Sequence, residues 1–290
     1  MKYKRTISLL IGCIIILSVF ASLVGIFSNA GSGVRQIESF RGETIKIYGK
    51  GLYGNDSVAV AAQGIAQDII TVALGVPLLI VSLYLALKDS LRGRLLLTGT
   101  LGYFLYTYIS YVFLWMYNPM FIVYVMLMSA SFFAFTLLMM SFDIINLSSA
   151  FNKKLPVKFL GGFQIFFAAA LWLLWMGKII PTITSGTVPV GLEHYTTLVI
   201  QGLDLGFIVP IALLSGVLLI KRKPLGYLLS SVIIMKGFTM GAALTAMIIS
   251  QYIAGVSMGI IEIIMFPMFS LVIFYCMILL LKNINCKGYA

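Results

Sequence analysis

Four charged side chains interrupt the long apolar stretches of this sequence and are its clearest candidates for chemistry. They are Asp68, Asp204, Lys236 and Glu262. A charged group among apolar residues is costly unless it is neutralised, so such groups pair, lose their charge or bind a ligand. Three carboxylates can bind a cation or exchange a proton, and one ammonium group can serve as their counter-ion.

Uncharged polar residues accompany these charges at helical spacing. Gln201 precedes Asp204 by three residues, and Gln63 precedes Gln67 by four. Tyr103 begins a similar row of hydroxyl groups on the next apolar segment. Residues three or four apart share one face of a helix, so these rows can face a common site. We therefore predict one ligand-binding site, formed by Asp204, Asp68, Lys236, Glu262, Gln201, Gln67 and Tyr103.

The composition indicates that these residues belong to a membrane protein. Apolar residues make up 61% of the chain, charged residues make up 10%, and the mean hydropathy is +1.06. A single core of 290 residues cannot hide so much apolar surface from water, whereas a bilayer accepts it. We predict an all-α polytopic integral membrane protein with eight transmembrane helices, at residues 6–27, 60–87, 95–117, 120–142, 158–180, 195–220, 227–250 and 256–281.

The net charge of +11 follows the positive-inside rule. Fourteen of the 20 Lys and Arg residues fall on one side of the predicted spans, mostly in short runs such as Lys221, Arg222 and Lys223. Five fall on the other side, and Lys236 lies within a span. The sequence therefore predicts a cell-membrane protein with both termini in the cytoplasm, and it predicts no nucleic-acid partner. Counting about 1.5 Å per residue from the basic runs places all four intramembrane charges in the outer half of the bilayer.

The first apolar segment has two interpretations. Residues 6–27 follow basic residues and precede small ones, as in a cleaved signal peptide, but an apolar run of about 20 residues favours a span. In the long loop that follows, residues 44–48 alternate like a short strand. One of Asn55, Asp56 and Ser57 is expected to cap the second helix.

The order of features around the second span returns around the sixth. Pro77 stands eleven residues before Lys88, and Pro210 stands eleven residues before Lys221. In both places a polar stretch precedes the proline and an apolar stretch follows it. We predict two parallel four-helix halves with the ligand site between them, and chance recurrence of membrane hairpins is the alternative. The predicted halves are residues 1–145 and residues 155–290.

Motifs for most enzyme and cofactor chemistry are absent from the sequence. It contains no P-loop motif, and its three cysteines lack metal-binding spacing. His194 is the single histidine, which excludes a bis-histidine haem site and an HExxH zinc site. We therefore expect no cofactor and no metal. An intramembrane enzyme is an alternative, with Glu193, His194 and Asp204 lining a pocket for a lipid-like substrate.

One stretch resembles multi-pass membrane proteins of microbial genomes to which no activity is assigned. It is GRLLLTGTLGYFLYTYISYVFLWMYN, at residues 93–118. The resemblance extends to GLYGNDS at residues 51–57 and to LEHYTTLVIQGLDLG at residues 192–206. It implies an eight-span membrane protein and transfers no site residue.

These observations predict binding or translocation of a small polar or cationic solute through an outward-facing polar pocket between the two halves. A non-transport membrane subunit, sensor or assembly factor is the second interpretation, because the chain has no long soluble segment. The polar residues also fit a structural role in which Asp204 neutralises Lys236 and amides bond between helices. The expected partners are membrane lipids, a small polar solute, and either a protein partner or a second copy of the chain.

Overall fold

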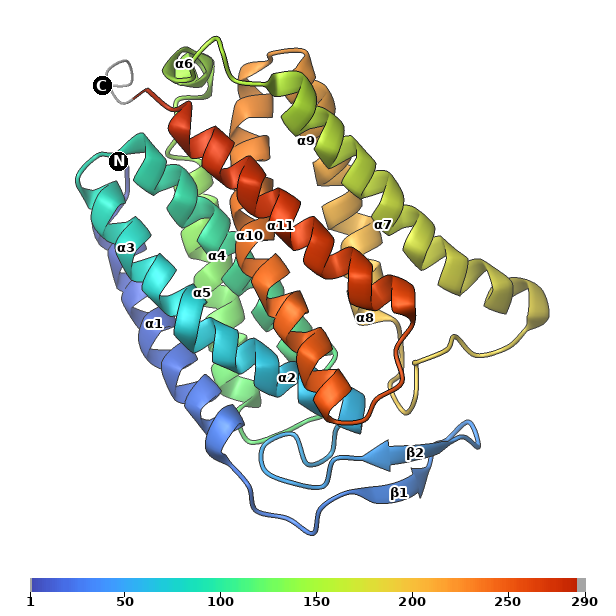
Figure 1. Cartoon of the computed structure of the whole chain (residues 1–290). Helices are drawn as coiled ribbons and strands as arrows, with labels where there is room; N and C mark the ends of the chain where they lie inside the picture. Colours follow the sequence, from blue (N-terminus) through green and yellow to red (C-terminus); the bar gives the residue numbers. More distant parts are fainter. Residues whose placement is uncertain (1, 286–290) are drawn as a thin grey trace.

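The computed structural model describes residues 2–285, and this range contains the eight predicted membrane-crossing helices (Figure 1). The predicted all-α membrane class is therefore confirmed. Six crossings are uninterrupted helices: α1 (Lys4–Phe27), α4 (Leu91–Phe113), α5 (Phe121–Met139), α7 (Val157–Ser185), α10 (Pro224–Ile253) and α11 (Ile260–Lys282). The short elements are strands β1 (Arg35–Glu38) and β2 (Thr44–Ile47), helix α6 (Ile144–Leu147) and the 3₁₀-helix η2 (Ser148–Ala150).

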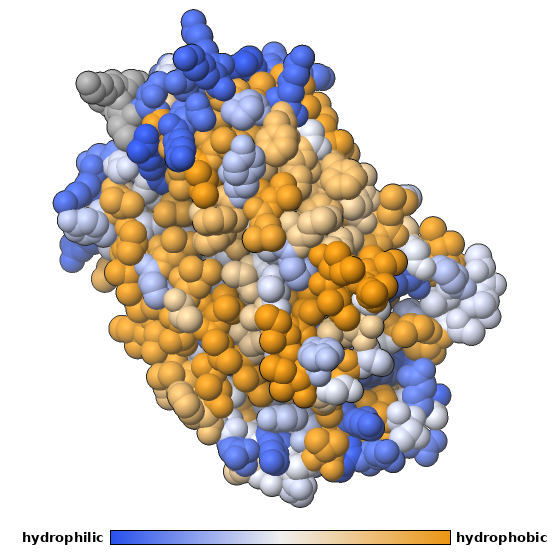
Figure 2. All heavy atoms as spheres, in the orientation of Figure 1, coloured by the Kyte–Doolittle hydropathy of each residue, from blue (hydrophilic) through white to orange (hydrophobic). Residues whose placement is uncertain are grey.

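The face of the bundle seen in Figure 2 has a broad apolar belt between two hydrophilic ends. Large apolar side chains such as Ile16, Phe133 and Leu271 are exposed along the helices. Exposed apolar surface of this extent fits contact with lipid. We name the two ends by their loops (Figure 1). The termini end carries residues 88–90, 140–156 and 221–223, and the hairpin end carries residues 28–57, 114–120, 186–198 and 254–259.

Two of the crossings are interrupted by π-helical segments. The second crossing is α2 (Val58–Ile70), η1 (Thr71–Gly75) and α3 (Val76–Leu87), and the sixth is α8 (Val199–Leu203), η3 (Asp204–Ile208) and α9 (Val209–Ile220). Pro77 and Pro210 stand at the start of α3 and α9. Proline has no N–H to donate, and its ring collides with the carbonyl group four residues earlier, so the helix widens before it. Such π segments occur frequently at functional sites.

The two broken helices continue with the same local geometry. Each ends at a lysine that is followed by a residue with positive φ, Asp89 at 56° or Arg222 at 53°. The next helix has a glycine at its third position, Gly93 or Gly226, where a side chain would collide with the preceding helix. The chain therefore follows a similar path after both prolines.

The helices form two groups that meet along α10. In the first group, α4 packs against α3 and α5, and α1 packs against α2 and α5. In the second group, α9 packs against α7 and α10, and α11 packs against α10. Helix α10 also packs against α2 and α4 of the first group. A side chain at Gly99 of α4 would collide with Met235 of α10, so a small residue permits this close approach.

The third span begins at Leu91, before its predicted start at residue 95. Ser90 caps this helix by accepting a hydrogen bond from a backbone N–H of the first turn at 3.3 Å. Arg94 consequently lies inside the helix, where its guanidinium group donates to the Ser141 carbonyl oxygen at 2.7 Å. Its long side chain keeps the charge close to the termini end.

The long loop at the hairpin end contains the predicted strand and its antiparallel partner. Strand β2 covers most of residues 44–48, and it pairs with β1 so that Arg35 lies opposite Ile47. Ser57 is the cap of α2, because its side chain accepts a hydrogen bond from the Val60 N–H at 3.2 Å. The cap prediction is therefore confirmed for one of its three candidates.

Replacing Gly99 with alanine tests the close packing of α4 on α10. The added Cβ atom would collide with Met235, so we expect a loss of about 1–3 kcal/mol in stability. The measurement is the thermal unfolding midpoint of the purified full chain in mild detergent. Gly162→Ala in α7 is the matched control, because nothing lies within 4 Å of its Cβ position. Equal midpoints for the two variants would contradict the close packing.

Candidate functional site

Asp204 lies where the two helix groups meet, and it accepts hydrogen bonds from both. Tyr106 of α4 donates its hydroxyl group to Oδ1 at 2.7 Å, and Trp175 of α7 donates its indole N–H to Oδ2 at 2.9 Å. Asp204 is the first residue of η3 and is 8% exposed. One carboxylate therefore connects α4 of the first group with α7 of the second.

Lys236 of α10 lies beside this carboxylate without forming a direct ion pair. Its ammonium nitrogen lies 4.0 Å from the centroid of the Tyr106 ring, which is a cation–π contact. Among residues 2–285, no acid lies within 4.0 Å of the Lys236 ammonium group. Tyr106 thus contacts both charges, one through its hydroxyl group and one through its ring. We call Tyr106, Trp175, Asp204 and Lys236 the Asp204 cluster.

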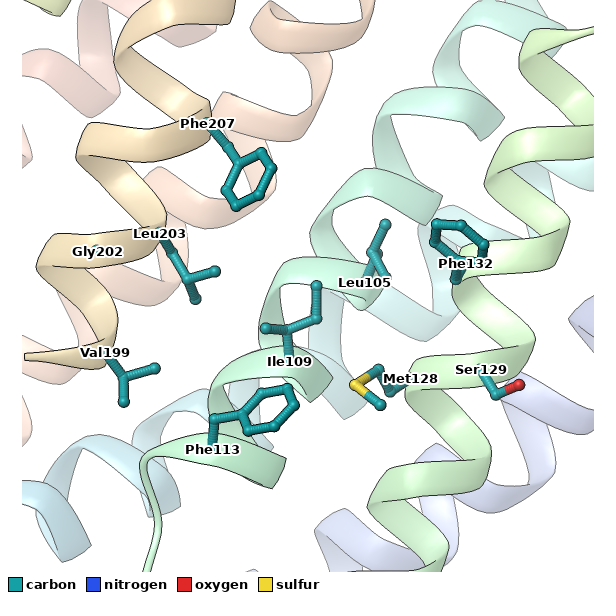
Figure 3. Close-up of a pocket in the computed structure, with 10 residues that line it drawn as sticks. All are labelled: Leu105, Ile109, Phe113, Met128, Ser129, Phe132, Val199, Gly202, Leu203 and Phe207. Atoms are coloured by element: carbon teal, nitrogen blue, oxygen red, sulfur yellow. The ribbon is translucent and has the colours of Figure 1, made fainter. Parts of the chain in front are cut away.

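A groove of about 640 Å³ lies between α4 and α5 of the first group and α8 and η3 of the second (Figure 3). Leu105 and Leu203 line it, and each neighbours a member of the Asp204 cluster in sequence. The Tyr106–Asp204 hydrogen bond therefore joins two of the helices that form its walls. Ser129 supplies the one hydroxyl group among the lining residues, so the lining of this groove is largely apolar.

Asp68 lies in a second buried cluster, inside the first helix group. Tyr53, from the loop before α2, donates its hydroxyl group to Oδ2 at 2.6 Å, and Tyr111 of α4 donates to Oδ1 at 3.2 Å. Gly25 of α1 packs directly on the carboxylate, and a side chain there would collide with it. Asp68 is 2% exposed, and within the described range no Lys or Arg lies within 4.0 Å of it. Tyrosines and a helix backbone therefore enclose this acid.

Gln67 and Tyr103, two of the predicted site residues, bind each other in the same helix group. The Gln67 amide donates to the Tyr103 hydroxyl group at 2.6 Å and to the Thr107 hydroxyl group at 3.0 Å. The Tyr103 hydroxyl group also lies 2.9 Å from that of Thr71, the first residue of η1. The first π segment thus begins with a hydroxyl group where the second begins with a carboxylate.

The remaining predicted residues lie outside these contacts. Glu262 of α11 forms an ion pair with Lys178 of α7 at 2.5 Å, with both side chains partly exposed. Gln201 is half-buried on α8, one turn before Asp204. The predicted residues are therefore divided between separate places in the bundle, and Glu262 belongs to neither buried cluster.

A third set of polar contacts, which the sequence analysis missed, joins the two groups at the hairpin end. Tyr195 donates its hydroxyl group to Asp56 Oδ1 at 2.9 Å, and the Met116 N–H donates to the same oxygen at 3.0 Å. Arg41 donates to the carbonyl oxygens of Glu193 and Tyr195, each at 2.9 Å. The sequence marks Asp56 as a candidate helix cap, but no spacing rule connects it to a loop of the second group.

The pKa of Asp56 is raised to about 7, mainly by burial and less by the charge of Glu193, although hydrogen bonds from Met116 and Tyr195 lower it. Asp56 is 1% exposed, and its Oδ2 has no hydrogen-bond partner among the described residues. Burial also raises the pKa of Glu193. Because Asp56 changes charge near neutral pH, the contact between the groups is sensitive to pH.

Comparison with protein-family models, with curated proteins and with solved structures gives no match for this chain. Within residues 2–285, no group of three or more His, Cys, Asp and Glu side chains is placed to hold a metal ion. The two buried clusters offer carboxylates, one ammonium group and phenol hydroxyl groups. These groups can bind a cation or transfer a proton.

Replacing Tyr106 with phenylalanine tests the hydrogen bond between the helix groups. The ring stays under Lys236, but Asp204 loses one donor, so we expect a loss of about 0.5–2 kcal/mol in stability. The measurement is thermal unfolding of the full chain in detergent. Tyr252→Phe is the control, because its side chain is 74% exposed. If both variants unfold at the same temperature, the Tyr106–Asp204 bond contributes nothing.

Replacing Asp56 with asparagine tests the pH dependence of the hairpin-end contact. Folded Asp56 keeps its proton up to about pH 7, whereas the unfolded chain releases it near the ordinary pKa of 3.8. The folded state is therefore favoured at low pH, and stability falls as pH rises through this window, by about 4 kcal/mol at most. Between about pH 5 and pH 8 we expect the unfolding midpoint of Asp56→Asn to vary less than that of the parent. Glu38→Gln, an exposed acid in β1, should keep the parental slope; parallel curves for all three proteins would contradict the assignment.

Proposed function

We propose that this multi-pass membrane protein binds a small polar or cationic solute at the Asp204 cluster and moves it across the membrane. The observation that carries the proposal is that Asp204 accepts one hydrogen bond from each helix group, through Tyr106 and Trp175. A solute that binds this carboxylate would replace a contact between the groups. Occupancy and relative movement of the groups would then depend on the same residue.

The π segments support this proposal. Broken helices form the binding sites of many transporters, and irregular backbone at membrane depth is tolerated where it lines a cavity or is buried in protein. Asp204 and Thr71 are the first residues of η3 and η1. The similar chain path after both prolines also fits two parallel repeats. In this proposal the moving units are residues 1–145 and residues 155–290.

Lys236 serves as a tethered counter-ion in this mechanism. Its ammonium group is buried near the Asp204 carboxylate but is held over the Tyr106 ring. A cationic solute at Asp204 would repel this ammonium group, because like charges interact strongly where little water is present. Binding would therefore displace Lys236 or remove its proton, and either change can favour a different arrangement of the helix groups.

We also propose that the protein lies in the cell membrane with the termini end in the cytoplasm. Most of the Lys and Arg residues belong to segments at that end, as the positive-inside rule requires. The hairpin end then faces outwards. In this orientation the pH-sensitive contact between Asp56 and Tyr195 lies on the outer side of the Asp204 cluster.

Uptake into liposomes that contain the purified full chain tests the proposed function. Radiolabelled methylammonium, guanidinium and choline are suitable probes, because each is a small cation of different shape. We expect Asp204→Asn to reduce uptake of the transported probe by about tenfold or more, because the neutral amide has no charge to attract a cation. Glu38→Gln, an exposed acid in β1, should retain the parental rate.

Two outcomes would contradict this proposal. Unchanged uptake by Asp204→Asn for every transported probe would place the site elsewhere. No uptake by the parent, together with a stoichiometric protein partner after purification in mild detergent, would favour a membrane subunit, sensor or assembly factor.

A further inference from the structure

Four buried polar atoms lie in the part of the first helix group near the hairpin end and have no hydrogen-bond partner within 3.5 Å among the described residues. They are Ser22 Oγ, Asp56 Oδ2, Trp115 Nε1 and Tyr124 Oη. Every one of these residues is buried, and Trp115 is the most exposed of them at 8%. Buried polar groups in folded proteins are nearly always hydrogen-bonded, so a set of orphans indicates ordered water or a bound ion.

Three of these atoms belong to residues that surround the Asp68 carboxylate. The ring of Tyr111, whose hydroxyl group binds Asp68, has its centroid 4.4 Å from that of Trp115 and 5.0 Å from that of Tyr124. Ser22 lies on α1, one turn before the glycine that packs on the carboxylate. The orphan groups therefore lie around an acid that has no Lys or Arg within 4.0 Å among residues 2–285.

The same polar region continues to Asp56 at the hairpin end. Met116, which follows Trp115, donates its N–H to the Asp56 carboxylate at 3.0 Å. The Asp56 N–H donates to the Tyr53 carbonyl oxygen at 3.0 Å, and the Tyr53 hydroxyl group donates to Asp68 at 2.6 Å. Asp56 and Asp68 are thus the two ends of one buried polar region.

We propose that Asp68 is a proton-binding site and that water molecules and tyrosine hydroxyl groups between Asp56 and Asp68 carry the proton from the hairpin end. Each step breaks one O–H bond and forms another, so a proton from bulk water converts the Asp68 carboxylate into a carboxylic acid without any oxidation or reduction. Proton binding at Asp68 does not depend on the proposed function. Its role, which is to couple solute movement to proton entry, rests on that function.

The enclosure of Asp68 favours a proton over a metal ion as the ligand. Both carboxylate oxygens already accept hydrogen bonds from tyrosines, and α1 closes the adjoining side at Gly25. The Trp115 N–H is a donor only and cannot ligate a cation. An ionised carboxylate without a cation is costly in hydrocarbon, and a proton removes that cost without requiring space.

The other titratable groups that face Asp68 are phenols. They come from the loop before α2, from α4 and from α5, and they are Tyr53, Tyr103, Tyr108, Tyr111 and Tyr124. From α1 the region receives the hydroxyl groups of Ser18 and Ser22 and a glycine backbone. Phenols in general ionise near pH 10, so the carboxylates at the two ends are the groups left to exchange a proton.

Infrared difference spectroscopy of the full chain in lipid nanodiscs tests this site. Between about pH 5 and pH 9 we expect a titrating C=O stretch from a protonated carboxylic acid. Asp56 also titrates in this range, so the band has more than one component. Asp68→Asn should remove the Asp68 component, Asp68→Glu should shift it, and Glu38→Gln should leave the spectrum unchanged. After a pH jump, Asp56→Asn should slow the change of the Asp68 component by about tenfold, because the entry group no longer exchanges a proton. Circular dichroism establishes that each variant is folded.

Identical titrating bands in the parent and in folded Asp68→Asn, or the absence of any such band from the parent over the whole pH range, would overturn the proton site. Sodium chloride and choline chloride are each added to the parent at constant pH. Loss of the Asp68 component with sodium chloride but not with choline chloride would assign the site to a metal cation instead. The spectra need no solute. A titrating Asp68 in a chain without any uptake would therefore overturn the proposed transport and leave the proton site intact.

Discussion

In hydrocarbon, every backbone N–H and C=O group needs a partner within the protein, and this constraint determines where the chain departs from a regular α-helix. Pro77 and Pro210 each remove one donor, and the preceding turns widen into η1 and η3. Thr71 and Asp204 occupy the first position of these widened turns. Regular hydrogen bonding is already interrupted there, so a local rearrangement disturbs fewer bonds than it would in the middle of an intact helix.

Helix α10 packs closely against α2 and α4, but the polar contacts between the two helix groups are few and lie at several depths. Gln63 of α2 donates to Gln251 of α10 at 3.1 Å, and Asp204 and Asp56 each accept a bond from a tyrosine of the other group. Hydrogen bonds between membrane helices contribute about 0.6 kcal/mol each on average, so these contacts together contribute only a few kcal/mol. Free energies of this size are within the range that a bound ligand can shift, provided that it binds the two arrangements differently.

The sequence predicted the spans well because hydropathy and basic runs report on the lipid directly, whereas side-chain partners depend on tertiary packing. The rows Gln63–Gln67 and Gln201–Asp204 predicted polar helix faces but not what they face. Asp68 binds Tyr53 from a loop, and Glu262 binds Lys178 on another helix, which no local spacing reveals. The third span begins earlier than predicted because a serine cap, not hydropathy, determines where that helix begins.

Asp68 and Asp204 have different surroundings, and the difference determines what each can hold. An ammonium group lies near Asp204, so this carboxylate can keep its charge in the membrane and exchange one cation for another. Among the described residues, phenols, a serine hydroxyl group and backbone surround Asp68, so a proton is the simplest way to neutralise it. Helix α4 contacts both acids, through Tyr106 and through Tyr111. Because both tyrosines belong to one helix, a shift of α4 changes both hydrogen bonds together, and this shared helix is a direct physical route by which a proton at Asp68 can alter the affinity of Asp204 for a solute.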